Sequence, residues 1–516
     1  MANRLRVQFF NDFTGGLNNN QQRQNLALNE TPDCLDVVFN ARGGFATRNG
    51  FQTLYVDALL NGGYIGGQFS IGTEQLWGLT STGSLWFWDG TSMSLPSITS
   101  LVSNPGGVRG VAWGGKLYFA NWLSGGTYLM RHWNGTAITT LGNVANDNYS
   151  APSGANAPLA RLIADHSGHM WWADTVEGGT RFRSRLRFSH PLQPENFASD
   201  DYFDIEPDDQ TNEITALVPF RNMLLVFKKR GVFAVFGTDR ESFVVERLST
   251  EAGVGSQEGV AVNSGVAYWW SPDGNVFAFN GSGVVPIGDR IVNVVRDKTV
   301  IPGGDHRVLW GEEKLWVSLQ KQDGSRILFV YDPAVGERGA WTRFSFEPSD
   351  WFWWRRNDGT SQVVFVVANK PCLYQFGDIF QEQDNDNGVV SSVAAYYKMA
   401  WFTANDTALK KKWRRPTITV ASTSISTLNV EVYYDFDEAA PNRVLTLPIA
   451  PTAGTYMVWG DVWGSLWSTS DPVYEFDRLS SLGRSNALQL KFEVTGHTGR
   501  WWVDSIAVPF FEKAYR

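Results

Sequence analysis

The stretch GSLWFWDG, from Gly83 to Gly90, decides the fold because it places Trp-Phe-Trp directly before an Asp-Gly turn. Aromatic side chains favour β-strands, and Asp-Gly favours a tight hairpin. The same order returns in GKLYFANW from Gly115, GHMWWADT from Gly168 and GVAYWWSPDGNVFAFNG from Gly265. The repetition predicts short aromatic strands joined by glycine-containing turns.

Segments with this texture recur along the middle of the chain, at a spacing of roughly 40–55 residues that is typical of four-stranded propeller blades. A sheet of four strands cannot bury both of its faces alone, so such blades stack around an axis and cover one another. We therefore predict a β-propeller of about seven blades, with Trp, Phe and Tyr packed between them. The segments are Gln75–Gly90, Lys116–Gly135, His169–Ser189, Asn222–Gly237, Val266–Gly281, Lys314–Asp332 and Ser361–Asp378.

The texture of the sequence divides the chain into three regions. Residues 1–55 are irregular and rich in Asn and Gln, which predicts an extended N-terminal arm that orders on a neighbouring subunit during assembly. Residues 56–385 carry the propeller pattern. Residues 390–516 alternate polar and apolar side chains with a period of two, which predicts a C-terminal β-sandwich domain. The predicted fold class is therefore all-β.

Composition excludes several classes of protein. The chain has 516 residues, of which 43% are apolar and 19% charged, and it has only two cysteines, so neither disorder nor a disulfide framework is indicated. No apolar run approaches the roughly 18 residues of a membrane span, and no signal peptide is recognisable. A soluble protein made in the cytoplasm is expected. The net charge of −8 argues against tight binding of nucleic acid.

Catalytic motifs are weak in this sequence. The segment SPDGNVF (Ser271–Phe277) loosely resembles the Asp-box turn of sialidases, but no regular series follows, and Asp273-Gly274 is more simply a hairpin turn. The spacing of His166 and His169 could serve a metal on a helix, yet the flanking Gly and Trp residues indicate a strand edge. No nucleophile elbow or phosphate loop is present. We expect no catalytic residues, no metal site and no cofactor.

An arginine-rich segment, RFRSRLRF, is followed by an acidic one, SDDYFDIEPDDQTNE. On a strand, the alternating arginines would project from one face. One interpretation is a solvated outer strand beside an acidic loop; the other is a subunit interface in which the two charged surfaces of neighbouring copies meet. The candidate interface residues are Arg181, Arg183, Arg185, Arg187, Asp204, Asp208 and Asp209.

The densest basic run is KKKWRRP, which ends at Pro416. It could contact phosphates or an acidic partner. A solvated strand edge protected by lysines is an equally good interpretation. The candidate contact residues are Lys410, Lys411, Lys412, Arg414 and Arg415.

The beginning of the chain resembles the beginning of a family of phage tail proteins. In that pattern an aromatic residue and GGLN are followed by an acidic Leu-Asp step, an Asn, a Gly and R-x-G. The segment DIEPDDQTNEITALVPFRNMLLVFKKRGVFAVFG, and an ending with SNALQLKFEVTG and WVDSIAVPFF, are also similar to that family. The matching N-terminal residues are Phe13, Gly15, Gly16, Leu17, Asn18, Asp33, Leu35, Asp36, Asn40, Gly44, Arg48 and Gly50.

The family is that of the tail nozzle, or tail tubular protein B-like, components of short-tailed bacteriophages, including packaged-DNA stabilisation proteins. The resemblance implies a homohexameric ring in the virion tail, assembled in the host cytoplasm below the portal and adaptor proteins. Such a ring would contact a tail fibre or spike, retain packaged DNA and let it pass on ejection without tight binding. Family members tend to carry insertions in the propeller, so this chain would be a compact version.

Two other functions stay open at this point. A propeller that degrades glycans would need convergent carboxylates or arginines at its axis and would release sugar from host polysaccharide. A receptor-binding tail protein shares the all-β texture and would bind host cells when isolated. An acidic conduit wall suits the nozzle, because strong phosphate contacts along a bore would hold DNA rather than let it slide.

Overall fold

The structure is a computed structural model, and nearly all of its regular secondary structure is β-strand. Its single α-helix in the described residues, α1 (Val292–Asp297), is short, and the two 3-10 turns are Ala58–Leu60 and Gln257–Gly259. No described helix is long and apolar enough to cross a bilayer. The all-β prediction is confirmed. The described residues are 5–71, 73–95, 109–120, 131–140, 159–263, 265–297, 300–356, 358–377, 381–424, 426–449, 481–495 and 498–512.

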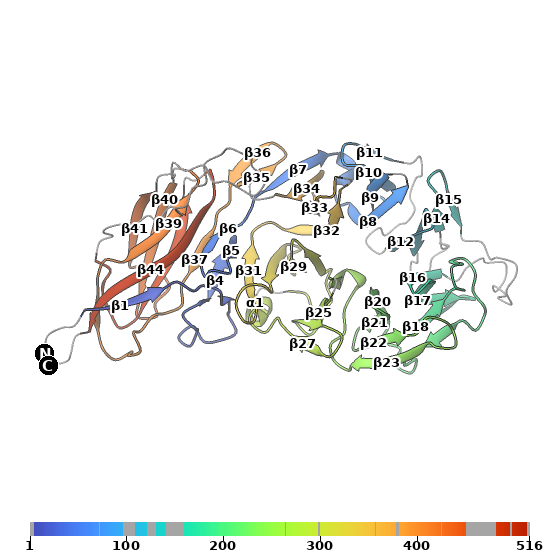
Figure 1. The fold of residues 1–516 in the computed structure, drawn as a ribbon, viewed down its shortest axis with the longest axis horizontal. Coiled ribbons are helices and arrows are strands. Elements are labelled where there is room, and N and C mark those ends of the chain that lie inside the picture. The colour runs from blue at the N-terminus through green and yellow to red at the C-terminus, as the bar shows by residue number, and fades with distance from the viewer. Residues whose placement is uncertain are drawn as a thin grey trace, which may run out of the picture.

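Six antiparallel sheets of four strands, and four antiparallel strands of a six-stranded seventh sheet, follow one another around a ring (Figure 1). Blade 1 contains β8 (Tyr64–Ile71), β9 (Thr73–Leu79), β10 (Leu85–Trp88) and β11 (Met93–Ser94). Blade 2 contains β12 (Arg109–Trp113), β13 (Lys116–Ala120), β14 (Arg131–Trp133) and β15 (Ile138–Thr140). Blade 3 contains β16 (Leu159–His166), β17 (His169–Glu177), β18 (Thr180–Phe188) and β19 (Tyr202–Asp204).

The remaining blades keep the same strand order. Blade 4 contains β20 (Ile214–Phe220), β21 (Met223–Lys228), β22 (Val232–Phe236) and β23 (Val244–Ser249). Blade 5 contains β24 (Val260–Val262), β25 (Ala267–Ser271), β26 (Asn275–Phe279) and β27 (Val284–Pro286). Blade 6 contains β28 (Arg307–Gly311), β29 (Lys314–Gln320), β30 (Arg326–Asp332) and β31 (Ala340–Phe344). Blade 7 contains β32 (Pro348–Arg355), β33 (Ser361–Val367), β34 (Cys372–Phe376) and β7 (Phe51–Val56).

Blade 7 closes the propeller with strands from both ends of the propeller sequence. Its outer strand β7 comes before blade 1 in the chain and pairs antiparallel with β34, which is the last propeller strand. The first strands of successive blades contact one another from β8 to β32, and β32 in turn contacts β8. The described residues therefore form a closed ring of seven blades, as the sequence predicted.

Each aromatic segment recognised in the sequence forms the two middle strands of a blade, and its side chains alternate between the neighbouring blades. In GSLWFWDG, Trp86 and Trp88 pack with residues of blade 7, whereas Phe87 packs with residues of blade 2. The short-range alternation of strand side chains thus explains why three consecutive aromatic residues are all buried. Residues 121–130 of the second segment lie outside the described residues.

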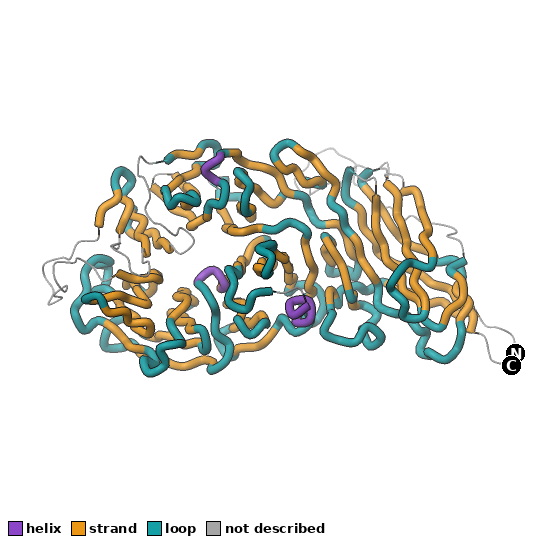
Figure 2. Tube along the Cα trace, turned by 180° about the vertical axis from the view of Figure 1, so that it is seen from behind, coloured by secondary structure: helices purple, strands orange, loops and turns teal. Residues whose placement is uncertain are grey.

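A domain of two sheets adjoins the propeller (Figures 1 and 2). The first sheet has the order β42 (Gly483–Ser485), β38 (Lys411–Trp413), β44 (Trp501–Glu512), β6 (Phe45–Thr47) and β5 (Val37–Phe39). Two further strands pair with β44, namely β1 (Leu5–Phe10) and β39 (Thr417–Ser422). The second sheet has the order β4 (Asp33–Leu35), β37 (Tyr396–Lys398), β43 (Leu488–Thr495), β40 (Ser426–Tyr434) and β41 (Arg443–Ile449).

The two sheets contribute to one hydrophobic core. Phe45 of the first sheet stacks on Tyr397 of the second, with ring centroids 4.3 Å apart, and also contacts Phe492. The same core continues into the propeller through Trp341 on β31. Residues 450–480, which belong to the region predicted as a sandwich, lie outside the described residues.

The N-terminal region differs from the extended arm predicted for residues 1–55. Its strands β1, β4, β5 and β6 belong to the two sheets, and β7 belongs to blade 7. A short parallel pair, β2 (Gly16–Leu17) with β3 (Glu30–Thr31), lies between them. Phe13 and Val37 are fully buried. The polar composition of residues 1–55 suggested that they form no core of their own. Their few apolar residues instead pack together with C-terminal residues in one shared core.

After blade 7 the chain adds a hairpin to the outside of that blade before it enters the two-sheet domain. The hairpin consists of β35 (Gln383–Asp386) and β36 (Val389–Ser392), and β35 meets β7 through Asn385 and Gln52. The propeller is therefore inserted between the N-terminal and C-terminal strands of the two-sheet domain. The domain boundaries predicted at residues 55 and 390 therefore place the N-terminal and C-terminal strands in different units, although these strands share one core.

Candidate functional sites: the interdomain joint and the charged surfaces

Arg48 lies at the point where the chain leaves the two-sheet domain and enters the propeller. Its Nε donates to Asp36 Oδ1 at 2.6 Å, and its Nη1 and Nη2 donate to both oxygens of Asp384 at 2.8 and 2.7 Å. The Arg48 side chain is fully buried. Burial disfavours its charge, but Asp36 and Asp384 outweigh burial and raise the pKa of the guanidinium. One cation thus joins an N-terminal residue to the hairpin that follows blade 7.

Aromatic rings and backbone groups surround this ion pair. The Arg48 guanidinium lies 5.0 Å from the ring centroid of Phe346 and 5.7 Å from that of Phe344. Asp36 has a left-handed backbone (φ 56°), and its Oδ1 also accepts a hydrogen bond from Ser345 N at 2.9 Å. Cation–π contacts and a second donor add to the Coulomb attraction in a buried place. The joint therefore connects blade 6 and blade 7 with both sheets of the two-sheet domain.

Two glycines of the family-like motif permit close backbone contacts at this joint. Gly16 has φ 65°, and a Cβ there would lie 2.8 Å from the backbone nitrogen of Trp341 on β31. Gly50 donates to Gln381 O at 2.6 Å, and a Cβ there would lie 2.0 Å from Gln383 O. Any larger residue would push the N-terminal segment away from blade 6 or away from the hairpin.

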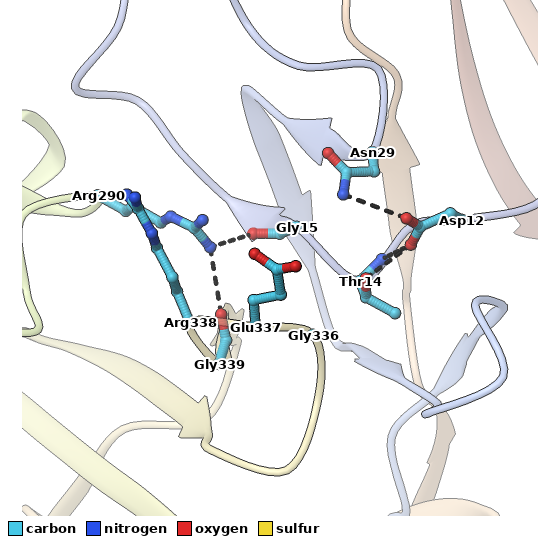
Figure 3. Close-up of a pocket in the computed structure, with 9 residues that line it drawn as sticks. All are labelled: Asp12, Thr14, Gly15, Asn29, Arg290, Gly336, Glu337, Arg338 and Gly339. Carbon is cyan, nitrogen blue, oxygen red and sulfur yellow. Dashed lines mark hydrogen bonds between the residues drawn. The ribbon is translucent and has the colours of Figure 1, made fainter.

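A cavity of about 440 Å³ opens where the N-terminal segment meets blade 6 (Figure 3). Arg290 spans it by donating to Gly15 O at 2.7 Å and Gly339 O at 3.1 Å. Partial burial of Asp12 favours its neutral form, but hydrogen bonds from Thr14 prevail and lower the pKa of Asp12. The cavity is lined by Asp12, Thr14, Gly15, Asn29, Arg290, Gly336, Glu337, Arg338 and Gly339.

The cavity was not found in the sequence, because its walls come from segments about three hundred residues apart. The loop GERG (Gly336–Gly339) and the motif Gly15-Gly16 were the only local signals. Its polar groups of both signs suit ion pairing and hydrogen bonding to a polar segment.

The predicted arginine strand is β18, and its arginines find carboxylates within their own chain. Arg185 donates through Nε and Nη2 to both oxygens of Asp204, at 2.9 and 2.8 Å, and lies between the rings of Phe182 (3.9 Å) and Tyr202 (3.8 Å). Arg187 donates to both oxygens of Glu177 at 2.8 Å. The arginine and acidic segments do meet, but the contact lies inside blade 3.

The other charged residues predicted at a subunit interface differ in exposure. Arg181 pairs with Asp174 and with Glu213, whereas the side chain of Arg183 is 40% exposed and lies 3.5 Å from Glu213. Asp208 is exposed, and Asp209 pairs with Arg230 at 2.9 Å.

Burial favours the neutral form of Glu177, but Arg187 and Arg185 prevail and lower the pKa of that carboxyl. Arg183, Asp204, Asp208 and Asp209 therefore keep some exposed surface, whereas Arg185 and Arg187 are buried.

The basic run lies on and beside β38. Lys411 is fully buried, and its Nζ donates to the carbonyl oxygens of Asp406 and Asn486, so it is not a surface cation. Lys410, Arg414 and Arg415 are exposed, and Lys412 is half-buried. The Arg414 guanidinium lies 5.5 Å from the ring centroid of Phe511. The predicted contact surface therefore loses Lys411 and keeps its other four members.

The turn at Asp273-Gly274 and the histidine pair have structural positions. Gly274 (φ 92°) closes the β25–β26 hairpin, as the simpler interpretation predicted. His166 ends β16 and His169 begins β17, so they face each other across a turn rather than along one strand edge. The described residues bring together no group of three His, Cys, Asp or Glu side chains suited to a metal.

No protein-family model matches the chain, and no curated protein matches it. Several solved structures are similar in part. They include the computationally designed Ika8 protein (12% identity, 63% of this chain, 100% of that one, TM-score 0.37). The WD40 domain of Neurospora crassa Pan2 is another, with 10% identity over 67% of this chain and 98% of that one and a TM-score of 0.38. YCF48 bound to D1 peptide is a third, with 10% identity over 67% of this chain and 98% of that one and a TM-score of 0.37. With TM-scores this low the likenesses carry no functional information, and the propeller is established by its strand pairing.

Proposed function

We propose that this chain is a structural virion protein of a short-tailed bacteriophage, one subunit of a ring-shaped tail nozzle. The observation that supports the proposal is the place of the family-like residues in the fold. Arg48 and Asp36 pair where the two-sheet domain joins the propeller, Gly50 lies against the hairpin after blade 7, and Gly16 lies against Trp341 of blade 6. In this proposal the motif that resembles nozzle proteins is the part of the chain that makes one rigid body from two domains.

A rigid joint is what a subunit of a DNA conduit needs. Packaged DNA presses on the walls of a nozzle, and a subunit whose domains swivel would let the channel change width. Arg48 links an N-terminal residue to Asp384 beyond blade 7, so the chain cannot open the propeller without breaking a buried ion pair. Breaking such a pair costs about 3–5 kcal/mol. The joint therefore favours a fixed channel wall.

Charge supports the passage of DNA rather than its capture. The chain has 52 acidic and 44 basic residues, and the arginines of β18 are largely neutralised by carboxylates of the same chain. Affinity for DNA scales with the number of phosphates that free cations neutralise. A subunit of this kind would line a channel with little grip on the backbone of DNA.

The proposal places the protein in the virion tail, as a hexamer that contacts portal or adaptor proteins on one side and a fibre or spike on the other. Its role is mechanical, without catalysis or a cofactor. The exposed loops of the propeller and the cavity of Figure 3 offer surfaces for such partners.

The proposal is tested by measuring the mass of the purified protein, alone and with a portal–adaptor assembly, beside two activity assays. Mass photometry should reveal a closed oligomer or an added ring on the assembly. Incubation with host polysaccharide should release no sugar, and the isolated protein should not bind host cells. A monomer that ignores the assembly and either releases sugar or binds cells would overturn the nozzle in favour of an enzyme or a receptor binder.

A further inference from the structure

The outer face of the first sheet of the two-sheet domain carries cations without carboxylate partners. Lys412 on β38 lies directly opposite Arg484 on β42. In the described part of the chain neither side chain forms an ion pair. Like charges at paired positions of neighbouring strands destabilise a sheet. The fold therefore keeps a repulsive pair that an anion from outside the chain would relieve.

The second sheet of the same domain treats a similar pair differently. Lys398 on β37 and Lys491 on β43 also lie opposite each other. The Nζ of Lys398 lies 2.6 Å from Glu438, and the Nζ of Lys491 lies 3.0 Å from Glu493. Each lysine of the second sheet is thus neutralised within the chain, which the cations of the first sheet are not.

Exposed apolar side chains adjoin the cations on the first sheet. Lys412 lies opposite Phe511 on β44, and Phe511 lies opposite Leu5 on β1. Directly paired residues project from the same face of a sheet. Leu5, Val7 and Phe9 are 51%, 43% and 65% exposed. Their strand β1 lies at the end of the molecule farthest from the propeller (Figure 1).

No carboxylate separates the apolar side chains from the cations on this face. The β44 residues opposite Phe9, Val7 and Leu5 are Ala507, Pro509 and Phe511, which are uncharged. A third cation, Arg414, lies with its guanidinium 5.5 Å from the ring centroid of Phe511. We call the surface formed by Leu5, Val7, Phe9, Lys412, Arg414 and Arg484 the β1–β42 face.

We infer that the β1–β42 face binds the surface of a membrane that contains anionic lipids. Its cations would lie at the level of the lipid phosphates, while Leu5, Val7 and Phe9 would enter the boundary between head groups and acyl chains. The free edge of β1 would stay among hydrated head groups, where water pairs with its backbone N–H and C=O groups. The inference does not depend on the proposed function.

Two other anionic partners fit this face less well. Single-stranded nucleic acid binds through phosphates and through bases stacked on exposed rings. Leu5 and Val7 cannot stack on bases, and Arg414 already lies over the ring of Phe511. An acidic protein would have to place apolar side chains in register with the β1 row. A lipid surface offers anions and hydrocarbon side by side, in any register.

Flotation of the full-length protein with lipid vesicles tests the inference. The protein should bind vesicles made of equal parts phosphatidylcholine and phosphatidylglycerol, and it should not bind vesicles of phosphatidylcholine alone. High ionic strength should weaken the binding. Lys412→Gln combined with Arg484→Gln should reduce it by about tenfold or more, because each cation near an anionic surface contributes roughly fivefold. Phe9→Gln should reduce it by about tenfold.

Thermal unfolding separates lost binding from lost folding. The Lys412→Gln, Arg484→Gln variant removes a repulsion, so it should melt no lower than the natural protein. Val444→Gln, at a valine 54% exposed on the second sheet, and Arg230→Gln, at an exposed arginine of the propeller, are the matched controls. Both should bind vesicles like the natural protein.

The vesicles carry no glycan, so this assay is separate from receptor binding on intact cells. Failure to bind the anionic vesicles, equal binding to phosphatidylcholine alone, or binding that survives both face variants would overturn the inference. Tighter binding to a single-stranded oligonucleotide or to polyglutamate than to the anionic vesicles would overturn it in favour of nucleic acid or an acidic protein.

Discussion

Arg48 and Asp384 are 336 residues apart in the chain, yet their side chains meet through two parallel hydrogen bonds in the interior of the protein. Asp36 accepts a hydrogen bond from the Nε of the same guanidinium. The whole propeller lies between the two partners in sequence. The pair therefore ties the start of the propeller to its end and fixes both to the two-sheet domain.

The first prediction concerns this joint. Arg48→Met should lower the free energy of unfolding by about 3–5 kcal/mol, because it leaves two buried carboxylates without their cation. Urea unfolding followed by tryptophan fluorescence measures the change. Arg230→Met, which removes an exposed partner of Asp209, is the control and should leave stability near that of the natural protein. A joint variant as stable as this control would contradict the role assigned to Arg48.

The second prediction concerns the arginine strand. Arg185→Ala should cost about 2–3 kcal/mol, since it removes charged hydrogen bonds to Asp204 and the contacts with two rings. Arg183→Ala, on the same strand but more exposed, should cost about 1 kcal/mol or less. Thermal unfolding of the two variants compares them. Equal and small effects would show that blade 3 does not depend on the Arg185 pair.

A companion measurement separates folding from assembly at this strand. Arg183→Glu leaves the buried pairs of Arg185 and Arg187 in place, so the protein should stay folded. If Arg183 faces a neighbouring subunit, this reversal should weaken oligomer formation, measured by light scattering. Unchanged oligomers at unchanged stability would remove β18 from the interface.

The third prediction concerns the N-terminal region. Deletion of residues 1–40 removes Phe10, Phe13, Leu17 and Val37 from the core, each worth about 1.5–3 kcal/mol. The sum approaches the whole stability of a typical domain, about 5–15 kcal/mol. The truncated chain should therefore be insoluble or lack a cooperative melt in circular dichroism. A soluble truncated chain that melts at the same temperature as the full-length protein would instead support the extended N-terminal arm expected from the sequence.

The fourth prediction concerns pH. Burial lowers the pKa of His306, whose Nε2 lies 2.6 Å from Ile301 O and whose Nδ1 accepts from Gln320 N at 3.2 Å. The unfolded chain then binds protons more readily than the folded one, so stability is full above the ordinary histidine pKa of about 6.5 and falls as pH drops below it. His306→Gln should reduce this slope. A slope unchanged by His306→Gln would assign the pH dependence to other groups.

The sequence predicted the middle of each blade well and its margins poorly. GSLWFWDG and its relatives are decisive because Trp86, Phe87 and Trp88 each fill an interblade space, which demands large side chains at alternating positions. Outer strands such as Val284–Pro286 are short and largely exposed, so their sequences carry no comparable requirement for large side chains. The closing strand Phe51–Val56 was missed as part of blade 7 because its partner lies at the far end of the propeller sequence.

The joint and the cavity were beyond sequence reasoning for a related reason. Arg48 is a residue of the family-like motif, but nothing in the local sequence connects it to Asp384, which lies at the very end of the predicted propeller region. The arginines of β18 were recognised as one charged face, yet which carboxylates they reach depends on how blade 3 folds back on itself. Long-range pairing, not residue type, decided whether each charge stayed at the surface.

The most direct test of the account is electron microscopy of the purified protein mixed with a portal–adaptor assembly. The account predicts a ring of copies, each with its propeller and two-sheet domain in the fixed relation held by Arg48, that extends the axial channel of the assembly. Copies that stay single, or that attach to the assembly without surrounding its channel, would contradict it.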